Sequence, residues 1–147
     1  MTGPRSLARE IELPASLGSL RPFSDWLKDA ARAVGLSDET AAGLDHALHE
    51  AVENVVRYAW DDPGGHRVRV CFRSDRDGVE VEVEDDGRPF DPRSVPAPVA
   101  PPGIEQVVPG GYGIAMIRHF TDELRYQRVG PRIRLTLVRR PAAGSGE

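Results

Sequence analysis

The chain has 147 residues, of which 39% are hydrophobic, so it is long enough for one domain with a single core. Its 19 basic and 23 acidic residues give a formal net charge of -4, which disfavours a sequence-independent grip on nucleic acid or on an anionic membrane. No apolar run is long enough to span a bilayer, and the start of the chain lacks the apolar core of a signal peptide. The single cysteine, Cys71, cannot form an internal disulfide, which fits a reducing compartment. We therefore expect a soluble, cytoplasmic protein.

Two helices are predicted in the first part of the chain. Apolar residues recur at helical spacing over residues 20–34, and Gly35 follows as a stop. A second helix begins after Ser37, a suitable N-cap residue, and runs to about Ala59. The apolar stripe that this second helix should bury consists of Leu44, Leu48, Ala51 and Val55.

An alternating pattern then replaces the helical one. In "HRVRVCFR" (66–73) and "GVEVEVED" (78–85), valines and a phenylalanine point one way while charged residues point the other. The two strands are expected to form an antiparallel hairpin that sets the Arg row opposite the Glu row. The valine rows should meet the helices, so that one face of the sheet is covered and the other is bare and wet.

The rest of the chain completes a small sheet. The segment "REIEL" (9–13) is expected as an edge strand, and residues 111–121 as a helix. The strands "ELRYQRV" and "RIRLTLV" follow, joined by a turn at Gly130 and Pro131. A Pro-rich loop of roughly twenty residues precedes that helix, and loops of this length are commonly functional lids.

The predicted order is β-α-α-β-β-loop-α-β-β. We expect an α+β fold, a two-layer sandwich whose mainly antiparallel sheet carries the helices on one face. Residues 1–140 should form the single domain, followed by a disordered tail over residues 141–147.

The first segment with candidate functional residues lies on the second helix. Glu50 and Asn54 are one helical turn apart, just beside the edge of the apolar stripe, so they should border a cleft. A carboxylate and an amide oxygen are hard ligands that suit Mg²⁺, and the carboxylate is also able to take a proton from an attacking hydroxyl. The alternative is an ordinary polar helix face.

The second segment is "VEDDGRPFDP", where a strand of alternating valines runs directly into Asp85, Asp86 and Gly87. A carboxylate buried at a strand end accepts hydrogen bonds from planar donors such as the exocyclic amine of adenine. The alternative is a plain Asp-Gly turn.

The third segment is "PGGYGIAMIRHF", in which Gly110, Gly111 and Gly113 stand between the loop and a helix start. Their backbone N-H groups are available to a phosphate at the positive end of the helix dipole. The segment is neither a P-loop nor a good Rossmann fingerprint, and its alternative role is a glycine hinge.

In this order, the three segments resemble the ATP-binding site of a known family. The helix "ALHEAVENVVRYAW" is similar to the N box, "VEDDGRPFDP" to the G1 box with its Asp-x-Gly core, and "GGYGIAMIRHFTDELRY" to the G2 box. From about Ile11 to Leu137 the chain resembles the small stand-alone ATP-binding proteins of the GHKL (Bergerat-fold) superfamily. Within that superfamily it is similar to the bacterial anti-sigma factor serine/threonine kinases.

The resemblance implies ATP and Mg²⁺ as cofactors. Asn54 would coordinate Mg²⁺, and Glu50 would be the general base that activates the acceptor hydroxyl. Asp85 would bind the adenine amine, while Gly87 would let the backbone approach the base. The glycine segment would make the phosphate contact and the loop before it would act as the ATP lid: Gly110, Gly111 and Gly113, and residues 93–109.

Two positions differ from the family pattern. Tyr58 stands where many relatives carry His, and Pro109 precedes the glycine pair where some carry a polar or basic residue. Arg57 and Arg118 are candidate replacements for a γ-phosphate contact, with solvated helix faces as the alternative. The histidines show no metal-ligand spacing in the sequence and are expected at the surface: His46, His49, His66 and His119.

The resemblance implies a kinase that phosphorylates a small antagonist protein and sequesters a sigma factor. A non-catalytic nucleotide-binding module that acts by partner contact is the alternative. The catalytic part of a two-component histidine kinase is disfavoured, because no helical segment with a phospho-accepting His lies ahead of the N box. A homodimer is implied by resemblance, and the first strand would be a suitable edge for it.

Overall fold

The computed structural model describes residues 6–62, 64–89 and 111–141, with the side chains of the last helix described from Ala115 onward. The elements follow the predicted order: β1 (Leu7–Pro14), the 3-10 turn η1 (Leu17–Ser19), α1 (Leu20–Ala33), α2 (Asp38–Tyr58), β2 (Arg67–Asp75), β3 (Gly78–Asp85), α3 (Gly111–His119), β4 (Glu123–Val129) and β5 (Arg132–Arg139). The predicted lid and most of the predicted tail, residues 93–109 and 142–147, lie outside the described residues.

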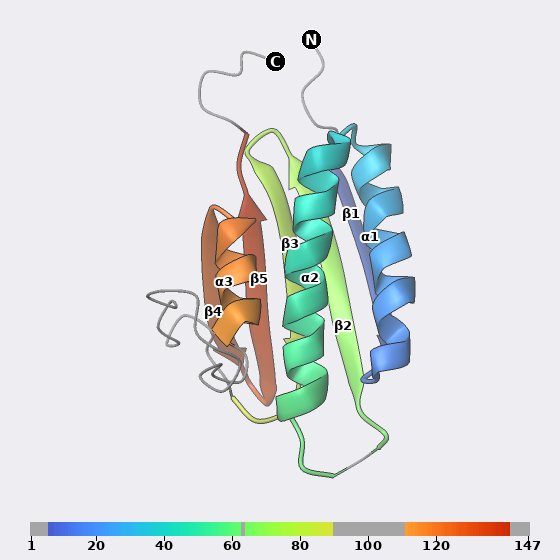
Figure 1. Cartoon of the computed structure of the whole chain (residues 1–147), viewed down its shortest axis with the longest axis vertical. Coiled ribbons are helices and arrows are strands. Elements are labelled where there is room, and N and C mark those ends of the chain that lie inside the picture. Colours follow the sequence, from blue (N-terminus) through green and yellow to red (C-terminus); the bar gives the residue numbers. More distant parts are fainter. Residues whose placement is uncertain (1–5, 63, 90–110, 142–147) are drawn as a thin grey trace.

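The five strands form one sheet in the order β1-β2-β3-β5-β4, and each neighbouring pair is antiparallel. The three helices lie on one face of this sheet, with α2 packed between α1 and α3 (Figure 1). The predicted α+β two-layer sandwich is therefore confirmed. The "REIEL" segment lies in β1 at one edge of the sheet, as expected.

Helix α2 begins where the sequence predicts. The backbone N-H of Thr40 donates to the Ser37 hydroxyl oxygen at 3.1 Å, and Asp38 and Glu39 stand in the first turn, where the helix dipole favours negative charge. Of the predicted stripe, Val55 is only partly buried, because it packs against the edge of the core and also lines a cleft. No helix among the described residues is long and apolar enough to cross a membrane.

The core lies between the helices and the inner face of the sheet. Its largest fully buried side chains come from every layer: Phe23, Leu27, Leu44, Leu48, Val52, Val68, Val70, Phe72, Val81, Ile117 and Leu137. At about 25 cal/mol per Å² of apolar surface removed from water, burial of this kind supplies the main favourable term in folding. It also fixes α2, which carries Glu50 and Asn54, against β3, which carries Asp85.

The outer face of the sheet carries the predicted charged rows. Arg69 lies opposite Glu84, and Arg73 lies opposite Glu80. The described helices leave this face uncovered, as expected, but the expectation that it is wet fails at Glu84, which is only 3% exposed. Arginine side chains from the two neighbouring strands pair with its carboxylate.

The last helix is shorter than predicted. Residues 111–121 were expected to be helical, whereas α3 ends at His119. The Thr121 hydroxyl donates to the carbonyl oxygen of Ile117 at 2.8 Å, and the Asp122 N-H donates to the carbonyl of Val138. These bonds turn the chain from α3 into β4.

Candidate functional site

An open cleft lies between the second half of α2, α3 and one end of the sheet. The space within it, open solvent included, is about 490 Å³. The walls are largely apolar and a few polar side chains converge on them. The lining residues come from α2 and β3, from the segments directly after each of them, and from α3, β4 and β5: Ala51, Asn54, Val55, Tyr58, Ala59, Val83, Asp85, Arg88, Ile117, Tyr126, Ile133 and Leu135.

Asp85 is the buried acid of this cleft. It is the last residue of β3 and is 5% exposed, whereas the following Asp86 is exposed. Its Oδ1 accepts a hydrogen bond from the Gly87 N-H at 2.8 Å, which leaves Oδ2 to receive a donor from a ligand. The sequence-based expectation of a buried carboxylate at this strand end is met.

Burial raises the pKa of the Asp85 carboxyl, because desolvation disfavours the charged form. The Gly87 N-H opposes this shift by stabilising the carboxylate, and the charge of Arg132 acts in the same direction. The neighbouring charges of Asp86 and Glu84 add to the rise in pKa. An ionised Asp85 is therefore costly until a second hydrogen-bond donor joins the Gly87 N-H.

Gly87 packs against the end of α2. A Cβ atom at this position would lie 2.6 Å from the carbonyl oxygen of Ala59, closer than real Cβ atoms approach. The next residue fixes the same contact, since the Arg88 N-H donates to that carbonyl at 2.7 Å. The Arg88 guanidinium also pairs with Asp61. A glycine is required here by this packing, in addition to any approach to a base.

The helix α2 contributes the two polar residues that the sequence singled out. Asn54 lines the cleft. Glu50, one turn earlier, is half-buried but is not part of the lining formed by the described residues. The two side chains thus lie on the same side of the helix, with Asn54 at the cleft and Glu50 beyond its edge.

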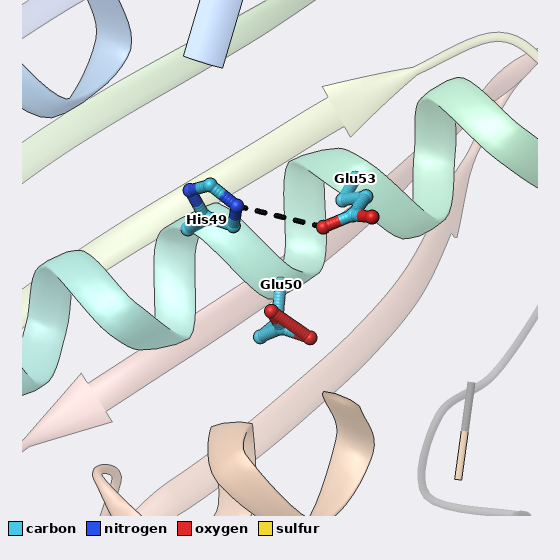
Figure 2. A group of neighbouring side chains, drawn as sticks. All are labelled: His49, Glu50 and Glu53. Carbon is cyan, nitrogen blue, oxygen red and sulfur yellow. Dashed lines mark ion pairs between the residues drawn. The ribbon is translucent and has the colours of Figure 1, made fainter. Parts of the chain in front are cut away.

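A group of side chains on α2 was missed from the sequence. The potential ligand atoms of His49, Glu50 and Glu53 all lie within 4.8 Å of one another, which contradicts the expectation that no histidine has ligand spacing. Figure 2 shows the three side chains projecting from α2, with the His49–Glu53 ion pair dashed. Glu53 also accepts a hydrogen bond from Arg57 at 2.8 Å, so its charge is already matched by protein partners.

The remaining predicted residues, in the glycine segment and among the arginines and histidines, do not line the cleft formed by the described residues. Gly111 is the first residue of α3 and Gly113 lies in its first turn, whereas Gly110 and Pro109 lie outside the described residues. Arg57 is exposed and paired with Glu53, so it does not reach into the cleft. The expected surface positions hold for His46, His49 and His119, while His66 is partly buried and stacks on Trp60.

Two cleft residues with polar groups, Tyr126 and Arg88, were not predicted. Tyr126 comes from β4 and Arg88 from the segment after Gly87, and both line the cleft. The alternation within β4 gives a signal for Tyr126, because it lies on the same side as Leu124, which packs on the core. For Arg88 the only signal is its place directly after the Asp-x-Gly core.

The fold and the cleft together define a class of ATPase domain. The sequence matches the family described as the histidine kinase-like ATPase domain over residues 13–139, and the chain belongs to this family. It is 30% identical to the serine/threonine-protein kinase BtrW of Bordetella bronchiseptica over 139 residues, which cover 92% of this chain and 95% of that protein. It is 26% identical to the serine-protein kinase RsbW of Oceanobacillus iheyensis over 120 residues, covering 79% of this chain and 76% of the relative.

Solved structures agree on the fold. The RsbU and RsbW domains of a Mycobacterium tuberculosis protein superpose with a TM-score of 0.60 at 24% identity, over 91% of this chain. This chain spans 32% of that longer chain. A histidine kinase domain from Erythrobacter litoralis superposes with a TM-score of 0.54 at 18% identity, over 87% of this chain and 61% of that one.

Replacing Asp85 by Asn should stabilise the ligand-free protein at neutral pH. The folded-state pKa of Asp85 is raised, so the wild type loses stability as the pH rises from the ordinary range of an aspartate through that raised pKa. The Asn variant keeps an oxygen to accept the Gly87 N-H and has no charge to desolvate. Urea unfolding across this pH range measures the effect; an advantage that grows toward acid pH would contradict it.

Gly87→Ala should destabilise the fold by about 2 kcal/mol, because its Cβ would force the segment away from Ala59. Gly64→Ala in the loop after α2 is the matched control, since a Cβ there meets nothing within 4 Å. Its effect should stay within about 0.5 kcal/mol. Denaturant unfolding of both variants makes the comparison, and equal losses would argue against the packing role of Gly87.

Proposed function

We propose that this protein is an ATP-dependent serine/threonine protein kinase of the anti-sigma-factor type. The observation that carries the proposal is the nearly buried Asp85 in an apolar cleft that Asn54 also lines, within a chain that belongs to the ATPase family. The names of the relatives BtrW and RsbW, both protein kinases, support the same activity. The substrate class is a serine or threonine hydroxyl of a small antagonist protein.

The cleft suits a purine ring. Val83, Ile133 and Leu135 offer an apolar surface from two adjacent strands, and Tyr126 adds an aromatic side chain from β4. Asp85 provides the acceptor for the exocyclic amine, which compensates the cost of keeping its charge out of water. Specificity for adenine then depends on the amine, because an oxygen in its place would face the carboxylate.

The Mg²⁺ site is assigned to Asn54. Its amide oxygen is a suitable hard ligand and lines the cleft one turn along α2 from Glu50. Bound Mg²⁺ would supply charge neutralisation at the phosphates of ATP. The beginning of α3, with Gly111 and Gly113, provides backbone N-H groups near the positive end of the helix dipole. Gly110 belongs to the same proposed phosphate contact.

Glu50 is proposed as the general base. The acceptor oxygen forms a bond to the γ-phosphorus as the bond to the bridging oxygen of ADP breaks, and Glu50 takes the hydroxyl proton. Its position beyond the cleft lining fits this role, because the acceptor is a protein that approaches from outside. Binding of the adenine ring and removal of the hydroxyl proton are thus assigned to different residues, Asp85 and Glu50.

The partners are proposed by resemblance of the three motifs to the anti-sigma factor kinases. They are a sigma factor, which the protein sequesters, and the antagonist protein that it phosphorylates. A homodimer is proposed on the same ground, with β1 as an available edge of the sheet. Neither nucleic acid nor a membrane is needed as a direct partner.

Calorimetric titration of Mg-ATP into the wild type and into Asp85→Asn tests the nucleotide site. The wild type should bind and the folded variant should lose most of the affinity, because an amide cannot match a carboxylate as acceptor. Absence of binding by well-folded wild type would overturn the proposal.

Glu50→Ala should abolish phosphate transfer, because a general base typically contributes 10²–10⁴-fold to the rate. ATP binding by this variant should stay within about twofold of the wild type. The assay follows label from γ-labelled ATP into an antagonist protein of the same organism. Glu53→Ala, the same change three residues further along α2, is the control and should retain transfer. Transfer at the wild-type rate by Glu50→Ala would remove Glu50 from the mechanism.

A different result would favour the alternative function, a non-catalytic nucleotide-binding module that acts by partner contact. If the wild type binds ATP and a partner but no phosphoprotein forms, and Glu50→Ala binds the partner equally well, the kinase activity is wrong while the nucleotide site stands.

A further inference from the structure

The outer face of the sheet, opposite the cleft, holds a carboxylate that the proposed mechanism does not use. Glu84 is 3% exposed, although it lies on the face that carries no helix. The other glutamates of this face on β3 are more open, with side-chain exposures of 30% for Glu80 and 14% for Glu82. Glu84 therefore differs from its neighbours in burial.

Three arginines surround this carboxylate. Arg69 of β2 and Arg134 of β5 lie opposite Glu84 in the strand register, one on each side. Arg69 donates to Oε1, and Arg134 donates to Oε2 through two nitrogens at 3.0 and 3.2 Å. Arg132 adds a nitrogen 3.6 Å from Oε1. We call these four residues the arginine clamp.

The Glu84 carboxylate stays ionised across the neutral range. Burial by itself would raise the pKa of Glu84, but hydrogen bonds from Arg69 and Arg134, together with their charges, outweigh it and hold this pKa below its ordinary value. A buried ion pair gives little net stability, since desolvation offsets most of the attraction. Its more direct consequence is geometric, because the short contacts join β2, β3 and β5 at one level of the sheet.

The arginine clamp and the cleft lie at the same end of strands β3 and β5, on opposite faces of the sheet. Glu84 immediately precedes Asp85, and side chains of consecutive strand residues point to opposite faces. On β5, Ile133 lies between Arg132 and Arg134, pairs with Asp85 in the register and lines the cleft. Each clamp residue on β3 and β5 is thus the chain neighbour of a residue that would contact the base.

Asp85 is restrained by the residues on both sides of it in the chain. It is the last residue of β3, and the chain turns away after it through Asp86 and Gly87. After it, the Gly87 N-H holds Oδ1, and the Arg88 N-H bond to the Ala59 carbonyl anchors this turn on the end of α2. Before it, the Glu84 carboxylate is held from both sides by arginines, which fixes the strand end within the sheet.

We propose that Glu84, held by Arg69, Arg132 and Arg134, is a positioning residue that aims the Asp85 carboxylate at the amine of the bound base. The inference rests on the proposed nucleotide site and deepens it. It assigns base selectivity to a cluster on the far face of the sheet, which touches no nucleotide.

The test compares the binding of ATP and of inosine triphosphate, in which an oxygen replaces the 6-amine. Calorimetric titration of the full chain with Mg²⁺ gives both dissociation constants. Wild type should prefer ATP by at least about tenfold, the size expected for a hydrogen bond to a charged group. Glu84→Gln should lower this preference to about threefold or less, mainly through weaker ATP binding.

Glu82→Gln is the matched control. It makes the same change two residues earlier on the same face of β3, where the carboxylate pairs with Arg73 at 3.3 Å. The control should keep the wild-type preference. If Glu84 had a structural role alone, its substitution would weaken the binding of both nucleotides by the same factor. The ratio of the two dissociation constants therefore separates positioning from a general loss of stability.

Each outcome decides the proposal. A preference in Glu84→Gln equal to that of the wild type, or an equal loss of affinity for both nucleotides, overturns the positioning role while the nucleotide site stands. Wild type without any preference for ATP would overturn the role of Asp85 itself, and the clamp proposal with it. Should Glu84→Gln fail to fold by circular dichroism, Arg134→Gln replaces it under the same criteria, because Glu84 then keeps two arginine partners.

Discussion

Asp85 holds a carboxylate out of water at the end of a strand, and much of the surrounding structure follows from that placement. Removing a charge from water costs several kcal/mol unless hydrogen bonds replace the lost hydration. Here one bond comes from the Gly87 backbone, and burial still raises the pKa. The free protein therefore keeps an acceptor that is incompletely satisfied. A donor of suitable shape that enters the cleft recovers part of this cost, which is a physical basis for affinity and selectivity together.

The two faces of the sheet differ in chemistry and in role. The inner face buries valines, leucines and isoleucines against three helices and forms the floor of the cleft. The outer face is charged, with cross-strand rows of opposite sign between β2 and β3. Because side chains alternate along a strand, any shift at one face is transmitted to the other through the same backbone. The cleft and the arginine clamp are for this reason two sides of one short segment of β3 and β5.

The sequence predicted the elements well because their signals are local. The N-cap Ser37, the alternation of valines and the Asp-x-Gly step each specify structure within a few residues, and the structure contains all three. The prediction of the cleft was partial, since Val55 and Tyr126 acquire their roles only when α2 and β4 line the same cleft in the folded chain. No local pattern brings these two distant segments together.

The arginine clamp was beyond prediction for a related reason. The Arg and Glu rows were expected to face each other, but nothing in the sequence distinguishes Glu84 from Glu82 or Glu80. The distinction comes from β5, which brings Arg134 opposite Glu84 on the side away from β2. Strand order is a tertiary property, and the pairing of β3 with β5 joins segments separated by the intervening α3 and β4.

The position of Glu50 separates ligand recognition from chemistry. Helix α2 buries Leu48 and Ala51 in the core and carries Asn54 at the cleft, so a single rigid element holds the proposed metal ligand and the proposed base in fixed relation. Asp85 belongs to a different layer, and its position depends on β3 and β5. A disturbance under α2 would move Glu50 and Asn54 together, whereas a disturbance on the outer face of the sheet would move Asp85 relative to both. Loss of transfer and loss of base selectivity should therefore arise from different groups of residues in this fold.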